Sequence, residues 1–131
     1  LGDIARLRAQ AGDVQGAMDL HQEKLAICRS LNDVDGIANA QFNLAQLDLS
    51  QQEHRSALER LAESWALLNQ IGRIDGIAAV GSTLGQLLAA FKHPDAVPVL
   101  RRAEEAWRML DQIENADAIK GIIRQIEAGA E

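Results

Sequence analysis

Apolar residues recur along this chain at the spacing of an amphipathic helix. The i, i+3, i+4, i+7 pattern is clearest in four stretches, which contain Ile37, Leu58, Ile77 and Leu100. Gly12-Asp13 with Gly16, and polar runs at residues 50–54 and 92–95, separate stretches of this kind. Pattern and breakers together predict helices at residues 2–11, 15–31, 35–51, 54–71, 75–91, 95–113 and 117–128.

The helical pattern repeats along the chain. The sequence Asp-Gly-Ile-Ala at residues 35–38 returns at residues 75–78, a shift of 40 residues. Leu58, Trp65 and Leu68 return as Leu100, Trp107 and Leu110 at a shift of 42, so two residues are inserted near 92–95. We interpret each repeat as a helical hairpin. The expected organisation is a single array: repeat 1 at 1–34 with a truncated first helix, repeat 2 at 35–74, repeat 3 at 75–116, and a further first helix or capping helix at 117–131.

An aspartate stands at or next to the expected start of three helices. These residues are Asp35, Asp75 and Asp117. A carboxylate there favours the positive end of the helix dipole and accepts hydrogen bonds from free backbone N–H groups. We therefore predict capping, rather than chemistry, for all three.

Composition narrows the fold class. Hydrophobic residues make up 47% of the 131 residues but aromatic residues only 3%, and there is no tyrosine. Ala and Leu, which lose least on entering a helix, dominate the apolar set, whereas strand-forming residues are scarce. The chain is predicted to be all-α. The single Cys28 excludes a disulfide framework and a cysteine zinc site.

Charge and hydropathy bear on partners and location. The formal net charge is -6 and the charges are spread along the chain, so there is no basic patch of the kind that nucleic acids or anionic membranes attract. No apolar run is long enough to span a bilayer, and the first residues lack the order of a signal peptide. We expect a soluble, cytoplasmic protein that binds neither nucleic acid nor membrane.

The chemistry-bearing side chains do not form a catalytic or metal-binding pattern. His21, His54 and His93 are not at a ligand spacing such as i, i+4 on one helix, so no metal or cofactor is expected. Cys28 aligns with leucines in the later repeats and is expected to be a buried core thiol. Trp65 and Trp107 are expected to fill the core. Charged neighbours on the helices are interpreted as surface ion pairs: Glu63, Glu104 and Glu105 with Arg60, Arg101 and Arg102.

Two segments resemble the tetratricopeptide repeat family. Ala11-Gly12-Asp13-Val14-x-x-Ala17 is similar to the family's turn and crossing alanine, and Leu84-Gly85-x-x-Leu88 stands where the family has Leu-Gly-x-x-Tyr. Ala5 and Ala45 hold the small position of Gly85. The chain departs from the 34-residue pattern in its period of 40, and in lacking the tyrosine and the terminal proline. The departing residues are Arg8 and Asp48 for the tyrosine, and Arg29, Asn69 and Asp111 for the proline. It is similar to the longer-period branch found in kinesin light chain, the Pins/LGN adaptors and Rap-type peptide receptors.

The resemblance implies an α-α superhelix, or solenoid, of antiparallel hairpins whose first helices line a concave groove for a partner peptide. Residues on the face left over by the apolar stripe are then the candidate groove residues. They are Arg6, Gln10, Asn39, Phe42, Asn43, Gln46, Ser82, Gln86, Arg124 and Gln125. Asn and Gln can hold a peptide backbone, and Arg can fork onto a carboxylate, so a peptide of acidic character is the expected partner. The alternative is that these are ordinary solvated helix positions.

Three functions remain open at this point. The first is a non-catalytic module that binds a protein or peptide, with no enzymatic activity. The second is a peptide-sensing segment of a larger signalling or transcription regulator. The third is self-assembly, in which terminal hairpins stack end to end into a homo-oligomer.

Overall fold

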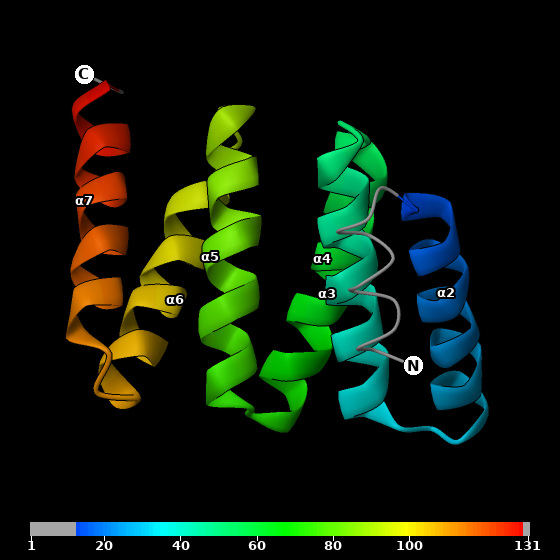
Figure 1. Cartoon of the computed structure of the whole chain (residues 1–131). Coiled ribbons are helices and arrows are strands. Elements are labelled where there is room, and N and C mark those ends of the chain that lie inside the picture. The colour runs from blue at the N-terminus through cyan, green and yellow to red at the C-terminus, as the bar shows by residue number, and fades with distance from the viewer. Residues whose placement is uncertain (1–12, 130–131) are drawn as a thin grey trace. The chain divides into compact units, whose positions relative to one another are not determined.

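The computed structural model describes residues 13–129, which form six helices and no strand (Figure 1). They are α2 (Val14–Ser30), α3 (Val34–Ser50), α4 (His54–Ile71), α5 (Ile74–Ala90), α6 (Ala96–Met109) and α7 (Ile113–Gly129). The helix numbering starts at α2, as in Figure 1. The helix expected at residues 2–11 lies outside the described residues. The chain divides into two compact units, Leu1–Leu67 and Leu68–Glu131, called here the first and the second unit.

The same left-handed turn closes the helices α2 to α6. One residue with positive φ follows each helix, and the set is Asn32, Gln52, Gly72, Lys92 and Asp111. The next residue returns a backbone hydrogen bond to the carbonyl five positions earlier, as from Asp33 N to Cys28 O at 2.9 Å. This pairing is the Schellman motif, which satisfies the last carbonyls of a helix and reverses the chain. Its recurrence about every 20 residues makes each helix antiparallel to the next within its unit.

Helix starts are capped by different aspartates than the sequence suggested. Asp13 and Asp33 accept hydrogen bonds from the N–H groups of Gly16 and Gly36, at 2.8 and 3.0 Å. Asp35 lies in the first turn of α3, inside the helix that Asp33 caps. At α5, Asp75 accepts from the N–H of Gly76 at 2.9 Å while Arg73 occupies the cap position.

The prediction for Asp117 is wrong. This residue lies inside α7, which begins at Ile113, and its carboxylate accepts a hydrogen bond from Arg108 at 3.1 Å.

Four helices agree with the predicted ranges to within one residue at each end, namely α2, α3, α4 and α5. The predicted helix at 95–113 ends earlier, at Met109, and the next helix begins earlier, at Ile113. The reason is Asp111, which takes φ of 60° and lets Gln112 N bond to Trp107 O at 2.9 Å. The apolar period runs on through this turn, and no glycine marks it. Gly16, expected at a break, lies inside α2.

The core of each unit is built from small and branched apolar residues. In the first unit, Leu44 and Leu61 are fully buried among alanines, and Cys28 is buried as predicted. In the second unit, Leu100 of α6 packs with Ile119 and Ile123 of α7. A Cβ built on the buried Gly85 would lie 2.4 Å from Leu100 Cδ2, so the small residue permits close contact between α5 and α6.

Trp65 and Trp107 are only half-buried, so the expectation that they fill the core is confirmed in part. Trp107 packs against the cluster around Leu100. Among residues 13–129, no helix has the length and apolar character needed to cross a membrane.

Candidate interaction face and its polar support

Three amide side chains follow one face of α3. Asn39 and Gln46 are exposed, and Asn43 is half-buried between them. Asn39 Oδ1 accepts hydrogen bonds from Asn43 Nδ2 and from Lys24 Nζ of α2, each at 3.1 Å. These bonds hold Asn39 and Asn43 in a fixed orientation, and no described residue bonds to the Asn39 amide nitrogen or the Asn43 oxygen. Gln46 makes no hydrogen bond to another described residue.

Phe42 is half-buried on the same helix. An aromatic ring next to exposed amides can anchor an apolar side chain of a partner, because it provides contact area without many rotamers to freeze. Asn39, Phe42, Asn43 and Gln46 therefore form one presented surface, called here the α3 face.

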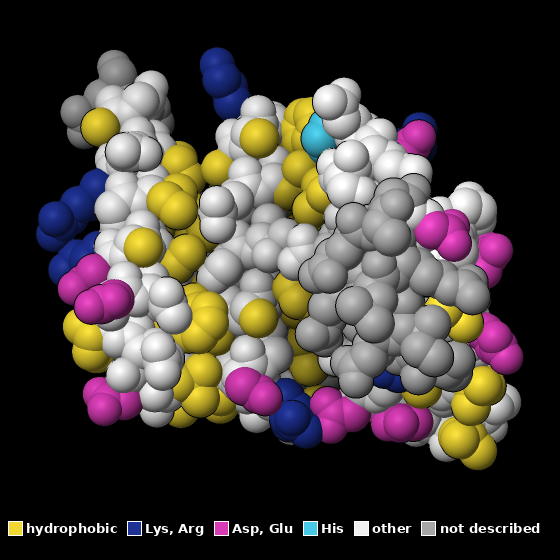
Figure 2. Space-filling view, in the orientation of Figure 1, with side chains coloured by type: hydrophobic (Ala, Val, Ile, Leu, Met, Phe, Trp, Pro, Cys, Tyr) yellow, Lys and Arg dark blue, Asp and Glu magenta, His cyan; other side chains and the backbone are white. Residues whose placement is uncertain are grey.

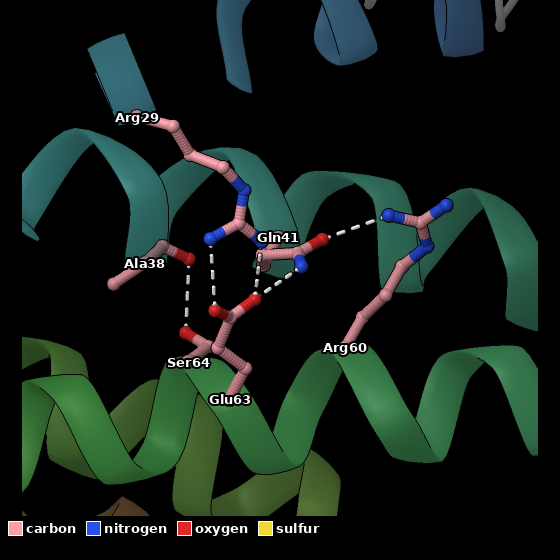
Figure 3. A network of polar contacts seen from close by, with 6 residues as sticks. All are labelled: Arg29, Ala38, Gln41, Arg60, Glu63 and Ser64. Carbon is pink, nitrogen blue, oxygen red and sulfur yellow. Dashed lines mark hydrogen bonds and ion pairs between the residues drawn. The ribbon is translucent and has the colours of Figure 1, made fainter. Parts of the chain in front are cut away.

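A network of polar side chains holds α3 against its neighbours (Figure 3). Glu63 of α4 accepts two hydrogen bonds from Arg29 of α2, at 2.7 and 3.0 Å, and one from the amide of Gln41 of α3. One carboxylate therefore joins three helices of the first unit. Figure 3 shows Arg29 reaching from above to the carboxylate, which points away from α4 toward α3.

The network continues along α4. Arg60 donates to Gln41 Oε1 at 2.8 Å and to Asp48 Oδ2 at 3.0 Å, and Ser56 donates to the same Asp48 oxygen at 2.7 Å. Asp48 is only 3% exposed and Gln41 6%. Among the described residues, no buried side-chain polar atom lacks a hydrogen-bond partner. Such complete pairing is required of buried polar groups, because an unpaired one loses its hydration without compensation.

The main ion pair of the network shifts the ionisation of both partners. The hydrogen bonds from Arg29 hold the pKa of Glu63 below its ordinary value, and the bond from Gln41 acts in the same direction. Glu63 in turn raises the pKa of Arg29. The pair is therefore fully charged at neutral pH and joins α2 to α4 by a bidentate contact.

Sequence reasoning missed most of this network. Glu63 was expected to pair with Arg60 on the helix surface, but it pairs with Arg29, while Arg60 turns to Asp48. A signal was available: Gln41 and Asp48 stand 4 and 11 residues after Ile37, on the buried stripe of α3. Polar residues at core positions indicate partners elsewhere in the chain.

The other surface pairs are rearranged as well. Glu104 pairs with Arg108 at 2.9 Å, and Arg101 pairs with Glu127 of α7 at 2.7 Å. Only Arg102 and Glu105 are neighbours as expected, at 3.8 Å.

The corresponding face of α5 is less available. Ser82 donates to Ala78 O at 2.7 Å and accepts from the Trp107 indole at 2.8 Å. Thr83 donates to the carbonyl of Ala79 at 3.4 Å. Gln86 is exposed. The structure thus assigns Ser82 an internal role, which is to satisfy the indole N–H of a half-buried tryptophan.

The remaining candidates are divided between α7 and the undescribed start of the chain. Arg124 and Gln125 are exposed on α7, and Arg124 makes no ion pair with a described residue. Figure 2 shows Lys and Arg side chains on the outer side of α7. Arg6 and Gln10 lie outside the described residues. No group of three or more His, Cys, Asp or Glu residues within 13–129 is placed to hold a metal ion.

Comparison with known proteins identifies the fold but no family. No protein family model and no curated protein matches the sequence. Among solved structures, the chain is similar to the crystal structure of BtubC (BKLC) from P. vanneervenii, with a TM-score of 0.61 and 15% sequence identity. The match covers 98% of this chain and 62% of that one.

The chain has an all-α, helical-repeat fold. It spans less than two thirds of the BtubC chain that it matches.

Proposed function

We propose that this chain is a non-catalytic interaction module whose α3 face binds an extended segment of a partner protein. The observation that carries the proposal is the row of amides on α3, in which Asn39 and Asn43 are oriented by hydrogen bonds and Gln46 is exposed. Amides spaced along a helix offer donors and acceptors to the backbone of a peptide, which needs both. The helical-repeat fold supports this function because stacked hairpins leave long exposed helix faces.

The polar network makes the α3 face rigid. Gln41 lies one residue before Phe42, and its bonds to Glu63 and Arg60 fix the rotation of α3 relative to α4. A preorganised surface loses less side-chain entropy when a partner binds. We also propose that the partner has acidic character, because Lys24 of α2 lies beside the α3 face and its Nζ donates a hydrogen bond to Asn39 Oδ1.

The test is selection from a phage library of random 12-residue peptides fused to the coat protein through their carboxyl ends. Selected peptides, labelled with fluorescein, are titrated with the chain by anisotropy. The double variant Asn43→Ala, Gln46→Ala is expected to weaken binding by about tenfold, because each lost hydrogen bond contributes about 0.5–1.5 kcal/mol. Unchanged affinity in this variant would show that the α3 face is not the binding surface.

Gln22→Ala provides the matched control. Gln22 is an exposed amide on α2, and two helical positions, or about 200° of rotation, separate it from Lys24, which contacts Asn39. Its removal deletes the same chemical group from another side of the first unit, so affinity should not change. Lys24→Gln should weaken acidic peptides more than neutral ones.

Self-assembly is a second candidate, favoured by exposed apolar side chains at the end of α2. Leu31 is 70% exposed and Ile27 46%. Contact between copies would remove this area from water. Size-exclusion chromatography with light scattering tests it: a mass that stays monomeric over a hundredfold range of concentration excludes it, and a mass that rises in the native chain but not in Leu31→Ser supports it.

A further inference from the structure

A cavity of about 520 Å³ opens in the second unit, at the C-terminal end of α5. The turn after α5, the start of α6 and the last turns of α7 complete its wall. Its lining combines an apolar body, from Ala89, Val97 and Ile126, with polar groups from Lys92, His93 and Gln125. Figure 2 shows hydrophobic side chains gathered between α5 and α7. Sequence reasoning interpreted residues 92–95 only as a turn.

The polar part of the lining is made of hydrogen-bond donors. Lys92 is exposed and forms no ion pair with a described residue. His93 Nδ1 accepts a hydrogen bond from the backbone N–H of Asp95 at 3.0 Å, so the ring proton of the neutral side chain is on Nε2, which can donate. Gln125 adds an exposed amide.

No described carboxylate lines the cavity. Asp95, whose side chain is 71% exposed and lies 3.8 Å from His93 Nδ1, is not part of the lining. In a chain of net charge -6, an apolar cavity with a lysine and without acidic groups is complementary to an anion that carries an apolar body.

We propose that this cavity binds a small apolar monocarboxylate, with the hydrocarbon body against Ala89, Val97 and Ile126 and the carboxylate on Lys92 and His93. The volume falls in the range of about 300–1,000 Å³ that is usual for small-molecule sites. Both parts of such a ligand are needed, because the apolar contacts contribute through burial and the carboxylate through charge-assisted hydrogen bonds. The site is separate from the α3 face and independent of the function proposed for it.

Octanoate is the probe. Octan-1-ol, which lacks the carboxylate, and acetate, which lacks the hydrocarbon body, serve as partial ligands. Titration of the ¹⁵N-labelled chain, followed by its backbone amide signals, locates and measures binding. We expect octanoate to shift the signals of residues 89–97 and 125–129, and to bind at least about tenfold more tightly than either partial ligand, since octanoate alone has both the hydrocarbon body and the charged hydrogen-bond acceptor. Equal binding of octanoate and octan-1-ol overturns the role of the carboxylate, and shifts elsewhere in the chain overturn the site.

Two pairs of variants separate the contribution of the lysine charge from that of the open cavity volume. Lys92→Gln is expected to weaken octanoate about fivefold to tenfold, whereas Lys120→Gln, which removes an exposed lysine of α7 outside the lining, should leave it unchanged. Ala89→Phe fills the cavity and should abolish binding. Ala90→Phe places the same ring on the next, exposed position and should not.

Circular dichroism of each variant confirms that it is folded before its affinity is compared. Retained binding in a folded Ala89→Phe variant overturns the proposal. A peptide ending in leucine is a further arm: if it binds with a free carboxylate more tightly than octanoate, but not as its amide, the small acid is excluded as the occupant in favour of a peptide terminus.

Discussion

The packing of α3 on α4 in the first unit and of α5 on α6 in the second unit solves the same problem with different chemistry. In the first, Gln41, Asp48 and Ser64 lie in the interface, and each is hydrogen-bonded. At the corresponding repeat positions the second unit has Gly81, Leu88 and Ala106, all buried. The turns that join the two pairs are nevertheless alike, with Gln52 and Lys92 at φ of 61° and 55°.

The helical hairpin therefore does not depend on one kind of interface between its two helices. Hydrogen bonds need fixed directions, so a polar interface favours one rotation of α3 on α4 over its neighbours. An apolar interface gains its stability from burial and close packing, with less penalty for small rotations. We therefore expect the stability of the first unit to depend on its hydrogen-bond partners, and that of the second unit on the volume of its buried side chains.

The largest effect is expected from the apolar interface. Leu100→Ala should lower the free energy of unfolding by about 3 kcal/mol, because it removes a fully buried side chain that contacts α7 and leaves a cavity. Urea denaturation followed by circular dichroism measures it. Leu58→Ala, at the corresponding but half-buried position of α4, should cost about half as much. Equal losses of unfolding free energy at the two positions would contradict the expected difference between the two interfaces.

A somewhat smaller loss of unfolding free energy is expected when the polar interface is changed. Asp48→Ala should cost about 2–3 kcal/mol, because Arg60 and Ser56 lose their shared acceptor at a site that is 3% exposed. Asp48→Leu introduces the residue found at this position in the second unit and should not restore stability, since Arg60 loses its carboxylate partner and keeps only the Gln41 amide oxygen. Adding Arg60→Met should recover part of the loss. Glu53→Ala, an exposed carboxylate in the next turn, is the control and should be nearly neutral.

Adding a methyl group tests the close contact in the second unit. Gly85→Ala should cost about 1–2 kcal/mol despite its better helix propensity, because the new Cβ meets the buried Leu100 side chain. The matching position in the first unit is Ala45, which is fully buried. There the reverse change, Ala45→Gly, should cost about 1 kcal/mol through propensity and lost packing. Thermal denaturation of both variants gives the comparison, and stabilisation by Gly85→Ala would refute the steric argument.

The smallest effect is electrostatic and depends on pH. The pKa of Glu63 is lowered in the folded chain, so its pair with Arg29 stabilises the fold above the ordinary pKa of 4.5, and this contribution is lost as the pH falls through the folded pKa. Glu63→Gln should lower stability at pH 7 by less than about 1 kcal/mol, because both partners are partly exposed.

The urea midpoints at pH 7 and at acid pH measure the electrostatic effect. The native chain and Glu63→Gln should approach each other as the pH is lowered below 4.5. The control in the second unit is Glu105→Gln, since Glu105 is exposed and 3.8 Å from its arginine, and this change should leave the urea midpoint at pH 7 almost unchanged. A constant difference between native chain and Glu63→Gln at all pH values would show that the ion pair is not its source.

Much of the fold was predictable because it depends on local pattern. The apolar period placed α2, α3, α4 and α5 to within one residue, and the repeat itself indicated the hairpins. The junction at Asp111 was missed because any residue can take the left-handed turn at a modest cost, so a turn without glycine has no reliable sequence signal. The candidate face was predicted residue by residue. Which of these side chains a partner could reach was not predictable. Ser82 accepts a hydrogen bond from Trp107, and the exposure of Gln46 depends on how the helices pack.

The helical repeat could be recognised from the sequence alone, because periodicity and helix propensity act within a few residues of one another. The sequence also placed Cys28 in the core and the amides on the outer side of α3. Three features became visible only when the helices were packed together: Glu63 joins Arg29 rather than Arg60, Asp48 is buried with partners from α4, and a cavity forms beside Lys92. Those features depend on which faces of different helices meet, and on side-chain directions that a linear pattern does not contain.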